Sequence, residues 1–418
     1  MRTTKRACEK ATYIVQVDEI NMAPIVVVEP VAYGLEHIPF NSAVLLMIRH
    51  LLPDQRFDLL LEVTHGDALM SSLPPEQRPY VRLQPIVLPP RTSRFWRRFA
   101  RDLLNIWRAM RLANRQHEDG LLVLLEAPAA TIYAVKLAGL LHDICGGRPR
   151  RIVIFLHGVL QDVFGWRPRA PWNRFKSVQN ALTFGSNANV SYVVLEEAIR
   201  REVIGKLPLL AGCVNVLPHP CAQPSPDHEA MDGGDDIDNQ SVKIGFVGLA
   251  AEGRGYGAFL DFARTNQTAG RVALQFHAIG SCPPDGVVLD DRFLATKPTA
   301  GKLPRDEFEL RLRQMDYICL PLDPKAYRYI ASGAFLDAVA FLKPIVALRL
   351  PFLDDIVAEY GDIGWLCDSL EEMQSVLTQL PTYLRSERYR QQQENLARLR
   401  ADRSPEALAK RFMKLITQ

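Results

Sequence analysis

Residues 317–349 read YICLPLDPKAYRYIASGAFLDAVAFLKPIVALR. The stretch opens with a short apolar run that ends at Leu320-Pro321 and leads into a second run from Pro344 to Leu350. Both runs predict buried strands, and the apolar residues between them recur at helical spacing. A strand, a polar loop, a helix and a second strand together predict one unit of a parallel α/β sheet.

The turn from the polar loop into this helix predicts an anion site. Ser332 stands at the N-cap position and Gly333 follows it, so the first helical turn presents backbone N–H groups without intrahelical partners. These donors and the helix dipole both favour a phosphate group. Asp337, one turn further along, is placed to accept a hydrogen bond from a ribose hydroxyl.

The segment Asp337 to Val346, DAVAFLKPIV, resembles the donor-site motif of GT-B glycosyltransferases, in particular the GT4-like group (glycosyl transferases group 1). In that family a Pro-ended strand precedes a loop with a Glu, a small-residue turn, a second Glu and an A-x-G-x-P-V-V/I strand. Asp337 takes the place of the second acid, whereas Tyr329 stands at the position of the first. The alternative interpretation is a parallel-sheet unit from any two-domain α/β protein.

A second loop, Gly248 to Gly255 (GLAAEGRG), is similar to the family's G-R-x-x-x-x-K-G loop, in which two cations neutralise the donor diphosphate. Arg254 falls at the Lys position, and Leu249 falls at the Arg position. The resemblance implies that Gly248 and Arg254 meet the leaving nucleoside diphosphate, with Arg328 as the candidate for the second cation. The alternative for Arg254 is a solvated loop charge.

The first half of the chain alternates buried strands with helices, which predicts a parallel, doubly wound sheet. Ligands of such sheets bind beyond the carboxyl ends of the strands. The predicted strands are Pro24 to Val28, Phe57 to Val63, Leu121 to Leu125, Arg151 to Leu156 and Val190 to Leu195.

Two loops that follow these strands carry candidate catalytic residues. In the first, Gly34 permits a close backbone approach to the donor, and Glu36 and His37 offer an acid/base pair. The alternative is that Glu36 caps the next helix and His37 binds a carbonyl. In the second, His157 and Gly158 follow a strand directly, and many GT-B members place a His in an equivalent loop near the reacting sugar. A structural His is the alternative there.

The resemblance implies an α/β protein of the GT-B kind, with two Rossmann-like doubly wound domains facing across a cleft that holds the active site. The expected organisation is a Rossmann-like acceptor domain at 22–220, a flexible linker at 221–241 that is rich in Pro, Asp, Gly and Ser, a nucleotide-sugar donor domain at 242–383, and C-terminal helices at 384–418 that cross back to the first domain.

Residues 91–115, RTSRFWRRFARDLLNIWRAMRLANR, hold eight arginines, one acid and two tryptophans. At helical spacing an apolar stripe that includes Trp96, Trp107 and Met110 lies opposite the arginines. This composition is typical of an interfacial helix on anionic lipid. The alternatives are a core-packed helix with a solvated basic face or a face for acidic partners, and nucleic acid is weaker because no binding motif accompanies the stripe.

The 418 residues carry a net charge of +3 and are 48% hydrophobic, as expected of a globular enzyme with more than one domain. The seven cysteines are scattered without metal-ligand spacing, which favours a reducing compartment. No apolar run has the length of a membrane span, so a cytoplasmic location is expected, with a peripheral position on the membrane face as an option. Asp235 to Asp238 lies in the linker, so no convincing Asp-x-Asp site, no metal and no cofactor beyond the nucleotide-diphosphate sugar is expected.

The resulting hypothesis is a metal-independent glycosyltransferase that moves a sugar from a nucleotide-diphosphate sugar to a glycan or lipid-linked acceptor in surface polysaccharide or exopolysaccharide biosynthesis. The expected partners are that donor, that acceptor and a membrane surface, but not nucleic acid. Two alternatives come from other classes of function. One is a catalytically silent GT-B-like subunit that binds a sugar nucleotide or glycan, motivated by Leu249 and Tyr329. The other is a sugar-nucleotide epimerase of similar architecture.

Overall fold

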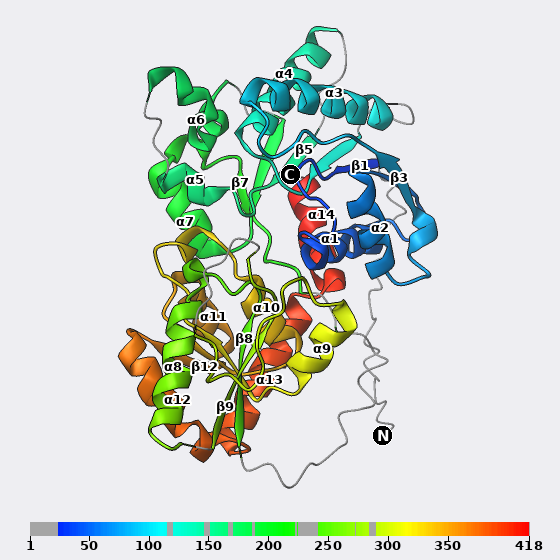
Figure 1. The fold of residues 1–418 in the computed structure, drawn as a ribbon. Helices are drawn as coiled ribbons and strands as arrows, with labels where there is room; N and C mark the ends of the chain where they lie inside the picture. The colour runs from blue at the N-terminus through cyan, green and yellow to red at the C-terminus, as the bar shows by residue number, and fades with distance from the viewer. Residues whose placement is uncertain are drawn as a thin grey trace, which may run out of the picture.

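Two separate sheets, each made entirely of parallel strands, organise the chain in the computed structural model (Figure 1). The first sheet has seven strands in the order β3-β2-β1-β4-β5-β6-β7, and the second has five in the order β12-β11-β10-β8-β9. The structure describes residues 24–114, 120–145, 151–165, 170–185, 189–221, 224, 241–271, 273–283 and 290–417.

The first sheet lies between two layers of helices. Successive residues of its strands face opposite sides of the sheet, and because both faces are apolar, helices cover each of them. Val26 and Val28 of β1 belong to the core beneath α3 and α4, whereas Ile25 and Val27 belong to the core beneath α1. The elements are β1 (Ile25–Val28), α1 (Ile38–Leu51), β2 (Phe57–Leu61), α2 (Val63–Ser72), β3 (Val81–Pro85), α3 (Phe95–Asn114), β4 (Leu121–Leu124), α4 (Ala129–Ile144), β5 (Arg151–Phe155), α5 (Leu160–Gly165), α6 (Val178–Thr183), β6 (Val190–Val194), α7 (Glu197–Lys206) and β7 (Val214–Val216).

The second sheet follows the same rule. Tyr317 and Cys319 of β10 pack with the core of α8, while Ile318 and Leu320 pack with that of α10 and α11. The elements are β8 (Val242–Val247), α8 (Tyr256–Thr268), β9 (Leu274–Ile279), α9 (Arg305–Arg313), β10 (Tyr317–Leu320), α10 (Gly333–Ala340), β11 (Ile345–Leu348), α11 (Pro351–Tyr360), β12 (Gly364–Cys367) and α12 (Leu370–Tyr383), followed by α13 (Glu387–Asp402) and α14 (Pro405–Thr417).

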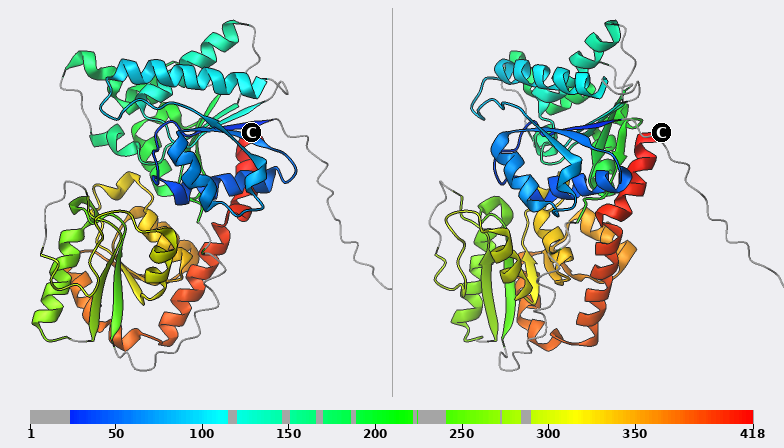
Figure 2. Two further views of the ribbon diagram at one scale, coloured as in Figure 1. Left: turned by 45° about the vertical axis from the view of Figure 1, so that its right-hand side comes forward. Right: turned by 90° about the vertical axis from the view of Figure 1, so that its right-hand side faces the viewer.

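The last two helices join the domains (Figure 2). Helix α13 packs against α10 and α11 of the second domain, and α14 packs against α1 of the first. Leu408 and Phe412 of α14 are buried in the same core as β1 and α1. Of the linker predicted at 221–241, residues 222–223 and 225–240 lie outside the described residues.

Several boundaries differ from the sequence prediction. The strand predicted at Phe57 to Val63 ends at Leu61, and Val63 begins α2. Helix α1 begins at Ile38, with His37 as its N-cap. Pro39 fits the first turn because the N–H that proline lacks would have no intrahelical acceptor there. Helix α3 begins at Phe95, and Arg115 lies outside the described residues. None of the helices among the described residues is both long and apolar enough to cross a membrane.

Candidate active site

The strand order of each sheet reverses at one point, between β1 and β4 in the first sheet and between β8 and β10 in the second. Loops diverge at such a point and leave a crevice beyond the carboxyl ends of the strands, where ligands bind. The loops that follow β1 and β4 carry Gly34, His37 and Glu126. Those that follow β8 and β10 carry Arg254 and Ser332.

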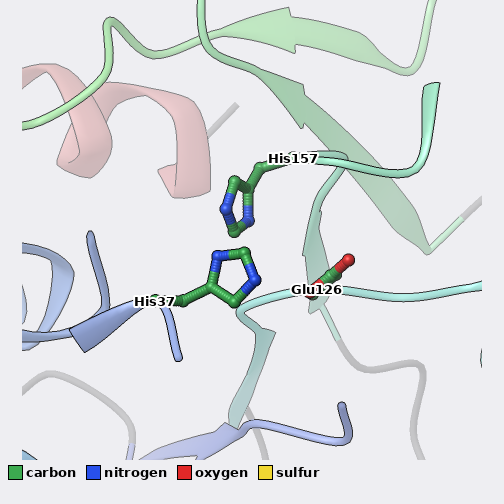
Figure 3. Close-up of side chains that lie close together, drawn as sticks. All are labelled: His37, Glu126 and His157. Carbon is green, nitrogen blue, oxygen red and sulfur yellow. The ribbon is translucent and has the colours of Figure 1, made fainter. Parts of the chain in front are cut away.

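Three side chains converge in the first domain (Figure 3). His37 is the N-cap of α1, Glu126 follows β4, and His157 follows β5. One nitrogen or carboxylate oxygen from each lies within 4.8 Å of the others. The two imidazole rings meet edge to face with centroids 4.5 Å apart, and Phe40 stacks on His157 at 4.4 Å. We call these three residues the His-Glu-His cluster.

Burial governs the protonation of this cluster. Glu126 is only 7% exposed, and burial, with the neighbouring charge of Glu29, raises the pKa of Glu126 to about 8. Burial also lowers the pKa of His157, and loss of solvent around the ring lowers that of His37, although His37 is the exposed member of the cluster. Near pH 7 the carboxyl group is therefore largely protonated and both imidazoles are neutral, each with one ring nitrogen able to accept a hydrogen bond.

A buried hydrogen-bond network holds the loop that presents His37. The carboxylate of Glu29 accepts hydrogen bonds from two backbone N–H groups of its own loop and from Asn41 Nδ2 at 3.1 Å. Asn41 Nδ2 lies 3.0 Å from His65 Nε2, and His65 Nδ1 lies 2.7 Å from the carbonyl oxygen of Gly34. Because a carbonyl only accepts, His65 Nδ1 carries the proton and Nε2 accepts from Asn41.

Glu36 does not join the His-Glu-His cluster and does not cap α1. Its carboxylate accepts a hydrogen bond from Tyr33 N at 3.1 Å and pairs with Arg91, so it closes its own loop. The pKa of Lys302, in the second domain, is lowered by burial, and the charge of Glu36 opposes this shift. The charge of Glu36 in the first domain therefore acts on Lys302 in the second domain.

The second domain gathers several predicted donor residues. Gly248 has φ +101°, and a Cβ there would lie 2.8 Å from Arg254 Nη1, so the guanidinium packs on the bare glycine backbone. Burial raises the pKa of Asp337 to about 6, against the charges of Arg305 and Arg254. Arg305 Nη1 lies 3.8 Å from Asp337 Oδ1.

The N-cap predicted at the start of the following helix is confirmed. Ser332 Oγ accepts a hydrogen bond from Phe335 N at 3.3 Å, and α10 begins at Gly333. The first-turn N–H groups of α10 therefore lie near the carboxyl edge of the second sheet, beside its switch point, and the segment that carries Arg254 follows β8 at the same edge.

Two predicted donor residues are engaged elsewhere. Arg328 donates a 2.7 Å hydrogen bond to Glu202 of α7. Tyr329 is buried with the core of the first domain, and its hydroxyl accepts a hydrogen bond from Lys206 Nζ at 2.7 Å. Both side chains make contacts between the domains, so donor binding by either one requires it to leave these partners. Donor binding by Arg328 and Tyr329 stays a prediction.

Sequence analysis missed Glu126, Glu29, His65 and Lys302. A signal existed for Glu126, which directly follows the apolar run Leu121 to Leu125, the same context that singled out His157. The network of Glu29 and His65 carried no such signal, because it depends on contacts between residues up to 31 positions apart.

No family model and no curated protein matches the chain. Solved structures do, over nearly the whole length. A glycosyltransferase from Rickettsia africae has a TM-score of 0.62 at 11% identity, covering 95% of this chain and 98% of its own. WaaG, a glycosyltransferase involved in lipopolysaccharide biosynthesis, has a TM-score of 0.59 at 13% identity, covering 94% and 99%.

A putative UDP-N-acetylglucosamine 2-epimerase from Listeria monocytogenes is also similar, with a TM-score of 0.55 at 11% identity over 94% of this chain and 95% of its own. At such identities the likeness concerns the fold alone. Together with the two parallel sheets, it shows that the chain has the two-domain, Rossmann-like GT-B fold. The predicted fold class is confirmed.

Proposed function

We propose that the protein is a glycosyltransferase that moves a sugar from a nucleotide-diphosphate sugar to a glycan or lipid-linked acceptor. The observation that carries the proposal is the position of a cation, a carboxyl group and a capped helix N-terminus on the two segments that follow β8 and β10, beside the switch point of the second sheet. These groups come from Arg254, Asp337 and Ser332. They match the chemistry of a nucleoside diphosphate, which carries phosphates and hydroxyl groups.

Arg254 is proposed to neutralise the diphosphate. Its guanidinium is held against Gly248, which fixes a positive charge before the donor arrives. The first-turn N–H groups of α10 add uncharged donors, and Asp337 is proposed to accept hydrogen bonds from donor hydroxyls. Because protein cations and dipoles supply the compensating charge, donor binding is proposed to need no metal.

The acceptor is proposed to bind against the first domain, with its reacting hydroxyl at the His-Glu-His cluster. His37 and His157 both have lowered pKa values, so their free ring nitrogens are available to accept a hydrogen bond from that hydroxyl near pH 7. The charge of Glu36 acts on Lys302 of the other domain, which supports a reaction site between the domains.

The protein is proposed to bind the cytoplasmic face of the membrane through the end of the first domain that carries α3. Such a position would suit a lipid-linked acceptor in surface polysaccharide assembly. Trp96 and Leu104 of α3 are 61% and 63% exposed, beside the exposed Arg94, Arg97 and Arg101. Helices α3 and α4 pack together at the end of the first domain that points away from the second (Figure 1). Exposed aromatic and aliphatic groups interleaved with arginines suit an anionic lipid surface.

A sugar-nucleotide epimerase is the second candidate, supported by the similarity to the Listeria protein. The two activities differ in their products. A transferase releases a nucleoside diphosphate only as the sugar moves to an acceptor, whereas an epimerase yields an altered sugar nucleotide without one. A subunit that binds the donor without turnover gives neither product.

The proposed function is tested by turnover of Arg254→Ala. Removing one preorganised positive charge from the leaving diphosphate is expected to cost about 2–4 kcal/mol of transition-state stabilisation, measured as kcat/KM for nucleoside diphosphate release. Arg264→Ala is the matched control, because Arg264 is an exposed arginine of the adjacent helix α8 that pairs with Asp261. Equal turnover in the two variants would remove Arg254 from the site.

A further inference from the structure

The His-Glu-His cluster has the composition of a metal site. We propose that His37, Glu126 and His157 bind a divalent transition-metal ion such as Zn²⁺. Two imidazole nitrogens and one carboxylate oxygen are ligands that Zn²⁺ prefers, and three protein ligands leave one position open for another oxygen. Donor atoms on a tetrahedral Zn²⁺ lie about 3.3 Å apart. The three donor atoms lie within 4.8 Å of one another, so they need to approach by up to about 1.5 Å to bind one ion.

Unused polar atoms at the cluster point to a missing ligand. Among the described residues, Glu126 Oε2 and His157 Nδ1 are both buried and have no hydrogen-bond partner. Glu126 is more than nine-tenths buried, so water does not readily replace that partner. Buried polar atoms are almost always paired, and leaving them unpaired costs free energy. A cation bound by all three residues would satisfy the carboxylate and the imidazole at once.

Neighbouring residues already hold the cluster in place. Phe40 stacks on the ring of His157, which also forms a hydrogen bond with the backbone of Leu125. A hydrogen bond that the second ring nitrogen donates to a carbonyl orients metal-binding histidines and fixes their tautomer. A Cβ at Gly158 would lie 3.3 Å from Glu126 Oε1, so the glycine leaves room for the carboxylate.

This inference does not depend on donor binding, but it changes the role proposed above for His37 and His157. With Zn²⁺ bound, their free ring nitrogens would hold the metal, and the acceptor hydroxyl would meet the metal instead of those nitrogens. The proposed metal site departs from the expectation, drawn from the sequence, that no metal is needed. The donor phosphates are proposed to bind Arg254 in the other domain, so the metal would act on the acceptor side. There its open position would take an oxygen, such as the acceptor hydroxyl, at the boundary between the domains.

The test is direct binding of Zn²⁺ to the full chain, measured by isothermal titration calorimetry after chelator treatment, without any donor. We expect one Zn²⁺ per chain in the parent and at least about tenfold weaker binding in Glu126→Gln and in His37→Asn. Asparagine suits position 37 because the backbone there is left-handed, with φ 52°. His50→Asn is the control, since His50 is an exposed histidine of α1 outside the cluster.

Binding that is lost in both cluster variants and kept in His50→Asn supports the site. No binding by the parent, or equal binding by the parent and the cluster variants, overturns it. His37→Asn keeps the test valid if the buried change at Glu126 prevents folding. Donor binding measured in the presence of chelator separates this result from the proposed function, because a failed metal site leaves that binding unchanged.

Discussion

At the scale of single residues, Asp102 makes a prediction about pH. Asp102 of α3 is 1% exposed and accepts a 2.6 Å hydrogen bond from Thr131, yet burial raises its pKa to about 6 from an ordinary value of 3.8. The folded protein therefore holds this proton more tightly than the unfolded chain does. Between about pH 4 and pH 6 the unfolded chain has lost this proton, whereas the folded protein still holds it. The free energy of unfolding therefore falls as the pH rises through this range.

Asp102→Asn should remove this penalty. We expect the variant to exceed the parent in free energy of unfolding by about 2–3 kcal/mol at pH 8, because each unit of pKa shift is worth about 1.4 kcal/mol. The difference should shrink to about 0.6 kcal/mol near pH 4, where Asp102 is protonated in the folded state and partly protonated in the unfolded chain. Urea unfolding of the parent and the variant at pH 4 and pH 8 measures this difference in free energy of unfolding. An equal difference at the two pH values would contradict the prediction.

Sequence reasoning found residues whose role follows from their place on a strand or helix. Ser332 was found because N-cap chemistry is local. His37 and His157 were singled out because they lie in loops that follow strands. The structure places them close together, and their catalytic roles stay predictions. Arg328 was predicted to face the donor, but its partner Glu202 lies 126 residues earlier in the chain, and no local pattern reveals such a contact.

At the scale of elements, helix α3 carries a prediction about membrane binding. Arg94, Arg97 and Arg101 are exposed near its N-terminal end, whereas Arg98 donates a hydrogen bond to the carbonyl of Pro30 and is left unchanged. Each exposed arginine near an anionic surface contributes about 1 kcal/mol at low salt. Replacing the three with Gln should therefore weaken vesicle binding by about a hundredfold, as measured by co-sedimentation with vesicles containing anionic lipid.

The matched control replaces three exposed arginines of the second domain, Arg264, Arg271 and Arg292, with Gln. This variant has the same net charge but keeps the α3 surface. Binding should persist in the control and weaken with added salt, since salt screens exposed charges. If the parent stays in the supernatant at low salt, or if both variants bind alike, α3 is not a lipid-binding surface.

The same helix shows why its function could not be settled from periodicity. The predicted apolar stripe ran through Trp96, Ile106 and Met110 on one face. Ile106 and Met110 are buried in the core with α4, but Trp96 is exposed. Helical spacing identifies an apolar face without saying what covers it. Strand β3 was not predicted from the sequence for a related reason. Its residues do not alternate between buried and exposed positions, and it ends with Pro85.

At the scale of the whole molecule, one buried ion pair links the two domains. Arg403, at the end of α13, donates hydrogen bonds of 2.6 Å and 2.9 Å to the carboxylate of Glu196, which precedes α7. Both side chains are less than a tenth exposed. Glu196→Ala should lower the free energy of unfolding by about 3–5 kcal/mol, because Arg403 would remain buried without its partner.

Asp355→Ala is the control for this pair. Asp355 pairs with Arg201 across the same domain boundary, but both side chains are more than a third exposed, so the loss should be below about 1 kcal/mol. Urea unfolding of both variants at pH 7 measures the difference. A loss for Glu196→Ala no larger than that for Asp355→Ala would show that the buried pair does not hold the domains together.

At this scale the architecture could be predicted from the sequence. Strands alternate with helices in both halves of the chain, which implies two doubly wound sheets. The contacts between the domains could not be predicted. Glu196 and Arg403 are 207 residues apart, and Tyr329 enters the core of the first domain from the second. Such pairings are settled by how the two sheets dock, which no periodic pattern encodes.

The central claim is that the switch point of the second sheet binds a nucleotide-diphosphate sugar. The most direct test is the thermal stability of the full chain with UDP-, GDP-, ADP- and dTDP-sugars, because a ligand that binds the folded state raises the melting temperature. We expect one class of donor to stabilise the parent and the Arg264→Ala control, and to stabilise Arg254→Ala and Asp337→Asn much less. If no donor stabilises the parent, or if all four proteins respond alike, the claim is contradicted.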